Sequence, residues 1–141
     1  MTTLPVLMVL LFAIWTITLL VLTVGVYRWG SVFAGKAKLM DFPSDKVEGS
    51  DFYKRAMRAH ANCVENLPVF VAVVFAVYTT NVNSDWVNVM TIIVLVARVM
   101  QSLVHVSFVQ TNTITFIRFC LFLSQIVCFF GIAVIALMAL I

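Results

Sequence analysis

The sequence predicts an all-α integral membrane protein, a bundle of four membrane-spanning helices in up-down order. Of the 141 residues, 63% are hydrophobic and 11% are charged, whereas soluble domains carry about 25% charged residues. The apolar residues gather in long runs joined by short polar segments, and a helix needs about 20 such residues to cross a bilayer. Because the length suits one domain and the connections are short, we expect a single four-helix domain over residues 1–141.

The first span, 4–28, is predicted by a run without any charged residue from Leu4 to Tyr27. A cleaved signal peptide is the alternative interpretation. It is disfavoured because no basic segment precedes the run, which is also longer than the about 7–15 apolar residues of a signal peptide. We therefore expect a retained anchor, followed by a polar loop at 29–50 that contains several glycines and a proline.

The second span, 51–80, is harder to recognise by hydropathy, because its first half contains several polar residues. Its apolar stretch, Leu67 to Tyr78, is too short to cross a bilayer alone, so the helix is expected to begin near Asp51. Pro68 should bend this helix, because proline removes one backbone hydrogen bond and clashes with the preceding turn.

The third span, 86–109, is interrupted by Arg98, and the fourth, 113–140, has Arg118 near its start. Short polar turns separate the second, third and fourth spans.

Lysine and arginine concentrate in and beside the first loop, at Arg28, Lys36, Lys38, Lys46, Lys54, Arg55 and Arg58. The positive-inside rule then places the 29–50 loop in the cytosol and both termini on the opposite side. Arg58 and Arg118 consequently approach the same side of the membrane. No aromatic residues alternate with basic clusters, so nucleic acid is not an expected partner.

The three cysteines, Cys63, Cys120 and Cys128, show neither a CxxC pattern nor the Cys/His spacing of a metal site. We expect no disulfide framework and no bound metal.

One face of each of the two middle spans is polar. At about 100° per residue, Arg55, Arg58, Asn62, Glu65 and Asn66 fall within an arc of about 100° on the second helix. Arg98, Gln101, Ser102 and His105 share one face of the third helix by the same measure.

Glu65 and Arg98 lie at similar depth, judged from a rise of about 1.5 Å per residue. We expect them to form a buried ion pair, since neither charge is tolerated alone in hydrocarbon. The alternative is that these polar residues simply hold neighbouring helices together through hydrogen bonds.

Arg55, Arg58, Asn62 and Arg118 form a second polar group near the cytosolic mouth. Several cations in one place would repel one another without a bound anion. The pattern therefore indicates an anionic, water-soluble molecule that reaches the site from the cytosol.

The segment "RAMRAHANCVENLPVF", residues 55–70, resembles the second-helix signature of the MAPEG family, the membrane-associated proteins of eicosanoid and glutathione metabolism. The match covers the pattern R-x-x-R-A-H-x-N-x-x-E-N-x-P-x-F. Chain length, the four spans, the basic first loop, Arg98 and Arg118 agree with this resemblance.

The resemblance implies a homotrimer with active sites between neighbouring subunits. Glutathione would bind from the cytosolic side as co-substrate, and a lipophilic electrophile or hydroperoxide would arrive from the membrane lipid. The resemblance implies that Arg58, Asn62 and Glu65 contact glutathione or shape its site. Arg55 and Arg58 would bind the carboxylates of glutathione.

Arg118 resembles the arginine that stabilises the glutathione thiolate in this family and is the expected catalytic residue. Lys36 or Lys38 corresponds to a basic residue that contacts glutathione carboxylates. Gln101 and His105 are candidates for the pocket wall, and for His105 a structural role is equally open.

The chain also departs from the eicosanoid-forming members of the family. Those members carry tyrosines or a histidine where this chain has Gln101 and His105, and a fourth-helix tyrosine is Phe122 here. The resemblance therefore implies a bacterial-type glutathione transferase, with hydroperoxide reduction open as a second activity.

Two other interpretations remain. A non-catalytic MAPEG-fold protein would bind glutathione or a lipid without turnover. A small transporter or channel would line its pathway with Arg98, Glu65 and His105, but the outer halves of the spans are continuous apolar runs with no polar second mouth.

Overall fold

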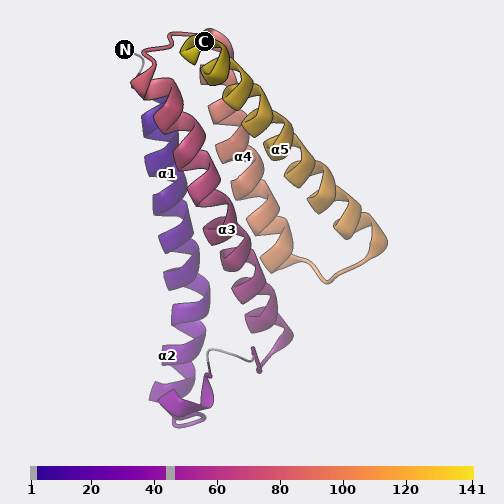
Figure 1. Cartoon of the computed structure of the whole chain (residues 1–141). Coiled ribbons are helices and arrows are strands. Elements are labelled where there is room, and N and C mark those ends of the chain that lie inside the picture. The colour runs from indigo at the N-terminus through magenta and orange to yellow at the C-terminus, as the bar shows by residue number, and fades with distance from the viewer. Residues whose placement is uncertain (1–2, 44–46) are drawn as a thin grey trace.

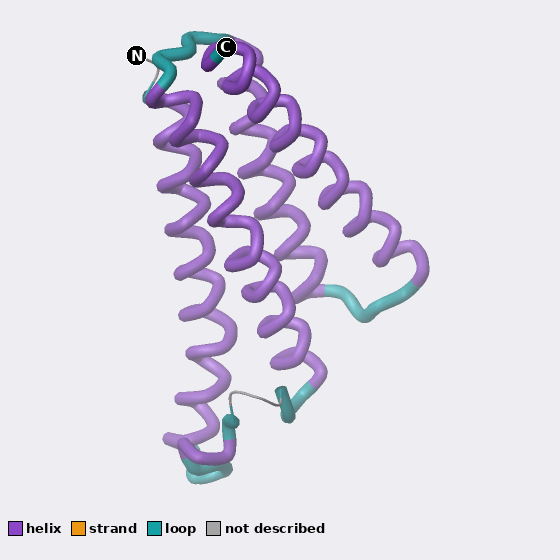
Figure 2. Tube along the Cα trace, in the orientation of Figure 1, coloured by secondary structure: helices purple, strands orange, loops and turns teal. Residues whose placement is uncertain are grey.

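The structure, a computed structural model, describes residues 3–43 and 47–141. Asp45 and Lys46, which belong to the predicted polar loop, lie outside the described residues. The described chain consists of the helices α1 (Leu4–Leu19), η1 (Leu20–Gly25), α2 (Val26–Phe33), η2 (Leu39–Asp41), α3 (Asp51–Thr79), α4 (Asp85–Ser107) and α5 (Asn112–Leu140). Figure 2 shows helices joined by short loops and no strand in this part of the chain.

The helices alternate in direction, as predicted. Both termini and the turn between α3 and α4 lie at one end of the bundle, and the two remaining connections lie toward the other end (Figure 1). Four helical segments of the described chain are long and apolar enough to cross a membrane: Leu4–Phe33, Asp51–Thr79, Asp85–Ser107 and Asn112–Leu140. The predicted all-α, four-span membrane fold is confirmed.

The first helical rod is longer than predicted. α1, η1 and α2 follow one another without a break, so the rod ends at Phe33 rather than near residue 28. Gly30 lies inside it, although glycine weakens a helix. The rings of Trp29 and Phe33, one turn apart, stack with centroids 5.5 Å apart, and the Ser31 hydroxyl donates to the Tyr27 carbonyl.

The other three spans begin and end within one or two residues of the predicted positions. α3 begins after Ser50, whose hydroxyl accepts a hydrogen bond from the Tyr53 backbone N–H at 3.2 Å. The negative charge of Asp51, in the first turn of α3, interacts favourably with the positive end of the helix dipole. α3 then continues through Pro68, so this proline does not end the helix.

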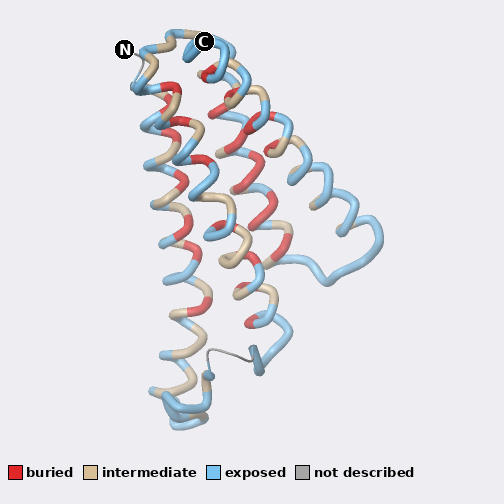
Figure 3. The backbone as a smooth tube through the Cα atoms, in the orientation of Figure 1, coloured by how far each residue is buried: buried red, intermediate tan, exposed pale blue. Residues whose placement is uncertain are grey.

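The core lies along the facing sides of α1, α3, α4 and α5. Figure 3 shows buried positions in red on the inward sides of the helices and exposed positions on their outer sides. Phe12, Phe70 and Phe129 meet at its centre, with ring centroids 5.5 and 5.8 Å apart. The outer faces carry large exposed apolar side chains such as Ile17 and Phe130, as expected for surfaces that contact lipid.

Candidate functional site

A groove of about 400 Å³ opens between α3, α4 and α5. It has the size of a small-molecule site. Its lining combines one cation, one carboxylate, amide groups and two aromatic rings, from Asn62, Glu65, Asn66, Gln101, Thr115, Arg118, Phe119 and Phe122. The fold thus brings together four residues predicted for the site, namely Asn62, Glu65, Gln101 and Arg118, with Phe122 beside them.

Arg118 enters the groove from the N-terminal half of α5. That helix begins after Thr111, whose hydroxyl accepts a hydrogen bond from the Ile114 backbone N–H at 3.2 Å and so fixes the helix start. The Nε atom of Arg118 is buried and has no hydrogen-bond partner among the described residues. An unpaired, buried N–H is costly, and the guanidinium of a residue that lines a groove is suited to bind an anion there.

Gln101 links the wall of the groove to α5. Its Nε2 donates to the Arg118 backbone carbonyl at 3.1 Å, and its Oε1 accepts from Gln125 Nε2 at 3.1 Å. Gln125 is fully buried and also donates to the Leu121 carbonyl at 2.8 Å. The amide of Gln101 is therefore engaged in holding α4 against α5, although its side chain also lines the groove.

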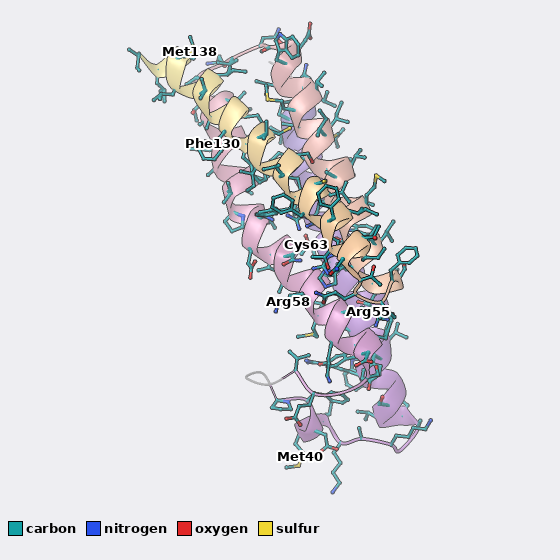
Figure 4. The ribbon with its side chains drawn as sticks, turned by 90° about the vertical axis from the view of Figure 1, so that its right-hand side faces the viewer. Met40, Arg55, Arg58, Cys63, Phe130 and Met138 are labelled. Atoms are coloured by element: carbon teal, nitrogen blue, oxygen red, sulfur yellow. The ribbon has the colours of Figure 1, made fainter. Side chains whose placement is uncertain are left out.

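Arg55 and Arg58 lie one turn apart in the half of α3 nearer the 34–50 loop (Figure 4). Arg55 Nε donates to the Val106 carbonyl at 3.2 Å, near the C-terminus of α4, where a cation also complements the helix dipole. Arg58 is exposed and lines a neighbouring groove of about 440 Å³ together with Lys54 and Met57. Neither arginine lines the Arg118 groove within the single chain.

The predicted Glu65–Arg98 ion pair is not formed in the single chain. Arg98 is 1% exposed, and its guanidinium lies 5.7 Å from the centre of the Phe12 ring on α1. Its Nε and Nη2 atoms lack hydrogen-bond partners among the described residues, whereas Glu65 is exposed and lines the groove.

Helix geometry explains this separation. The α3 residue that meets the Arg98 face of α4 is Cys63, whose sulfur lies 3.4 Å from Ser102 Oγ, and Ser102 Oγ donates to the Arg98 carbonyl at 2.8 Å. Cys63 and Glu65 are two residues apart, so they project from opposite sides of α3.

Neither His105 nor Lys38 lines the groove. His105 is 5% exposed on α4, and its Nδ1 has no partner among the described residues. Lys38 is exposed before the short helix η2, where its backbone N–H donates to an Asp41 carboxylate oxygen at 2.7 Å. Over the described ranges, no group of three or more His, Cys, Asp or Glu residues could hold a metal ion.

Four groove residues were not among the predicted site residues: Asn66, Thr115, Phe119 and Phe122. Asn66 belongs to the polar arc predicted for the second span, so the sequence already indicated that it faces the same side as Asn62 and Glu65. On α5 the four groove residues are 115, 118, 119 and 122, which is the spacing of one helical face. That pattern is hidden in the sequence because most residues around it are apolar as well.

The sequence model of the MAPEG family matches residues 5–138, nearly the whole chain. The chain belongs to the MAPEG family. A comparison with curated proteins and one with solved structures found no match.

The resemblance of residues 55–70 to the MAPEG signature is thereby confirmed. This family includes glutathione transferases and also members without catalytic activity. Its members are membrane proteins, and the four spanning helices of this MAPEG chain make it a multi-pass integral membrane protein.

Proposed function

We propose that this MAPEG protein is a glutathione S-transferase that joins the glutathione thiolate to lipophilic electrophiles. The observation that carries the proposal is the groove of about 400 Å³ between α3, α4 and α5, which Arg118 lines together with Asn62 and Glu65. Family membership supports the same activity class.

The two walls of the groove suit the two substrates. Asn62 and Asn66 offer amide donors and acceptors for the peptide groups of glutathione, and Glu65 offers a carboxylate to its amino group. Phe119 and Phe122 form an apolar wall, and both side chains are exposed on the outer side of α5. A lipophilic electrophile would approach along that wall from the hydrocarbon.

Arg118 is the proposed catalytic residue. A thiol with a pKa of about 8.5 is ionised to only a few per cent at pH 7. A guanidinium at about 4–6 Å lowers the pKa of such an acid by about 1 to 3. The thiolate then attacks an aryl halide: a carbon–sulfur bond forms, and the halide leaves with the bonding electron pair.

The same thiolate could reduce a lipid hydroperoxide. The thiolate attacks the terminal peroxide oxygen and breaks the O–O bond, which releases the alcohol after protonation and leaves glutathione sulfenic acid. A second glutathione thiol then displaces water from the sulfenic acid and forms glutathione disulfide. This is the second reaction that we propose for the site, because a thiolate beside an apolar wall suits both substrates.

The active assembly is proposed to be a homotrimer with the grooves at subunit boundaries. Arg58 and Glu65 support this, because both are exposed on a spanning helix of the single chain, where exposure to hydrocarbon would be costly. In a trimer, the cations of one chain would bind the carboxylates of a glutathione molecule held by the neighbouring chain. These cations are Arg55, Arg58 and Lys38. The grooves would open toward the cytosol, the side on which the positive-inside rule places the first loop.

The test uses the full-length protein in lipid nanodiscs, supplied with glutathione and a lipophilic aryl halide. We expect accumulation of the thioether and saturable glutathione binding. Asn62→Ala should weaken glutathione binding, and Asn83→Ala, in the turn at the other end of the bundle, should not. If glutathione neither binds nor reacts, the proposal is wrong.

A non-catalytic glutathione-binding protein is the second candidate. Two observations favour it: the amide of Gln101 is engaged with α5, and Phe122, without a hydroxyl group, occupies the groove wall. Ultraviolet absorbance of the bound thiolate distinguishes the candidates, since a binding protein need not ionise the thiol. Saturable binding without thiolate absorbance or turnover would establish the second candidate.

A further inference from the structure

Thr115 lines the Arg118 groove with a polar group that no contact of the chain uses. Its side chain is exposed, and its hydroxyl forms no hydrogen bond with the described residues. By contrast, the hydroxyls of Thr16, Ser102 and Ser124 each donate to a carbonyl in the preceding turn of their own helix. The Thr115 hydroxyl is therefore a hydrogen-bond donor that a ligand in the groove can use.

The start of α5 does not depend on this hydroxyl. Thr111 caps the helix by accepting a hydrogen bond from the Ile114 backbone N–H. The Thr115 backbone N–H bonds to the Thr111 carbonyl at 2.9 Å. Neither bond involves the Thr115 side chain, so replacing its hydroxyl with a methyl group breaks no described hydrogen bond of the helix.

The groove residues of α5 follow a fixed order along one face of the helix. They are Thr115, Arg118, Phe119 and Phe122. At about 1.5 Å per residue, Arg118 lies about 4.5 Å beyond Thr115 along the helix axis, and Phe122 lies about 10.5 Å beyond it. Because α5 begins at the end of the bundle opposite the two termini (Figure 1), the face leads from a hydroxyl, past a guanidinium, to an apolar wall deeper in the membrane.

We propose that Thr115 makes this site selective for electrophiles in which a carbonyl group is conjugated to the reacting carbon, namely α,β-unsaturated ketones and aldehydes. This inference rests on the transferase activity proposed above. The carbonyl oxygen and the reacting β-carbon are the two ends of one short conjugated unit, and an apolar group on the β-carbon extends it. The oxygen binds at Thr115, the β-carbon meets the thiolate beside Arg118, and the apolar group lies along Phe119 and Phe122.

The reaction is an addition without a leaving group. The glutathione sulfur forms a bond to the β-carbon, the carbon–carbon π pair moves toward the carbonyl carbon, and the carbonyl π pair moves onto the oxygen, which gives an enolate. The Thr115 hydroxyl donates a hydrogen bond to this oxygen. Because the negative charge on the oxygen grows as the transition state forms, that bond is stronger in the transition state than in the bound substrate. A proton from water then adds to the α-carbon and completes the thioether.

The test compares benzylideneacetone with benzyl chloride, using the full-length protein in lipid nanodiscs and glutathione. Both electrophiles carry a phenyl ring on the reacting carbon, but benzyl chloride reacts by displacement of chloride and has no carbonyl oxygen. Thr115→Val should lower the ratio of the two kcat/KM values, ketone to chloride, by about tenfold or more, the effect of one hydrogen bond to a charged group. A general disturbance of the groove would lower both values alike and leave the ratio unchanged.

Two further variants locate the effect. Thr115→Ser keeps a hydroxyl and should retain most of the ratio. Thr113→Val is the matched control, because Thr113 is also exposed in the first turn of α5 but does not line the groove. It precedes Thr115 by two residues and so projects from a different side of the helix. The ratio in Thr113→Val should equal that of the unmodified protein.

A pair of isomers tests the order of groups along the groove. Benzylideneacetone carries the phenyl ring on the β-carbon, and crotonophenone carries it on the carbonyl carbon. The enhancement over the uncatalysed addition of glutathione should be about tenfold greater for benzylideneacetone, the order of the effect of burying one phenyl ring. Only its ring can reach Phe119 and Phe122 while the oxygen lies at Thr115.

An unchanged ratio in Thr115→Val would overturn the proposal. So would a ratio in Thr115→Ser as low as in Thr115→Val, an equal fall in Thr113→Val, or equal enhancement of the two isomers. In each of these cases conjugation of benzyl chloride by the unmodified protein still supports the transferase proposal. If the unmodified protein conjugates benzyl chloride but not benzylideneacetone, only the inference about Thr115 is wrong. If it conjugates neither electrophile, both proposals are wrong.

Discussion

Replacing Arg118 with alanine should shift the ionisation of bound glutathione while leaving the fold intact. The contact that joins α5 to α4 at this position uses the Arg118 backbone carbonyl, which accepts from Gln101 Nε2 at 3.1 Å. That bond does not depend on the side chain. The Nε atom of Arg118 has no hydrogen-bond partner among the described residues, so replacing the side chain breaks no described bond to that atom.

The size of the effect follows from the thiol pKa. A decrease of about 2, from about 8.5 to about 6.5, raises the thiolate fraction at pH 7 from about 3% to about 75%, a factor of about 25. The nucleophilicity of a thiolate falls with its pKa, with a Brønsted coefficient of about 0.4–0.5, which offsets about eightfold of this gain. Turnover at pH 7 should therefore fall only about threefold in Arg118→Ala, but the thiolate absorbance should fall about 25-fold.

The pH profile gives the decisive assay. In the unmodified protein the bound thiol has the lower pKa and stays ionised to a lower pH. The turnover of Arg118→Ala should therefore fall to about a tenth of that of the unmodified protein near pH 5.5. By the same arithmetic the two turnover rates should be equal at about pH 7.6, between the two pKa values, and Arg118→Ala should be about eightfold faster well above the higher pKa, where both thiols are ionised. Arg118→Lys keeps the charge and should give an intermediate profile. An identical apparent pKa in Arg118→Ala and the unmodified protein, or a deficit independent of pH, would refute this role for Arg118.

Three further predictions concern the helices that position the groove. Gln101→Leu should destabilise the protein by about 1–3 kcal/mol, because it leaves unpaired the buried N–H of Gln125 that does not bond to the Leu121 carbonyl, while the Gln101→Leu/Gln125→Leu double variant should cost less than Gln101→Leu alone; thermal unfolding in detergent measures both, and an equal or larger loss in the double variant would contradict the pairing. Glu65→Gln and Arg98→Met should show a coupling in stability well below that of a buried ion pair, since the two side chains form no ion pair in the single chain; a coupling of about 3 kcal/mol or more would contradict this separation. Thr111→Val removes the N-cap of α5 and should cost about 0.5–2 kcal/mol, whereas an unchanged unfolding midpoint would mean that the helix start is held by other contacts.

Four spanning helices could be predicted from the order of residues alone. The uncharged run from Leu4 to Tyr27 and the other apolar runs are local properties, and the thickness of the bilayer sets how long each must be. The end of the first rod could not be placed in the same way. The rod runs on through Gly30 to Phe33, and there Tyr27 stacks on Tyr53 of α3 and Arg28 donates to the Tyr53 hydroxyl, which are contacts with a distant segment that no local pattern shows.

Part of the candidate groove was also predictable. Asn62, Glu65 and Asn66 share an arc of α3 because helical periodicity fixes relative directions on one helix. The motif at residues 55–70 placed the chain in the MAPEG family, which the match over residues 5–138 confirms. The groups that face one another across helices were harder to assign, as Glu65 and Arg98 show.

Equal depth in the membrane suggested a pair between Glu65 and Arg98, but pairing also requires the right rotation of each helix about its axis. Packing sets that rotation: Cys63 meets Ser102, and this contact turns Glu65 toward the groove and leaves Arg98 beside Phe12. The period of one helix determines which residues lie together on its face. Only the packing of whole helices determines what each face meets, because that choice is shared among many weak contacts and appears in no single segment of the sequence.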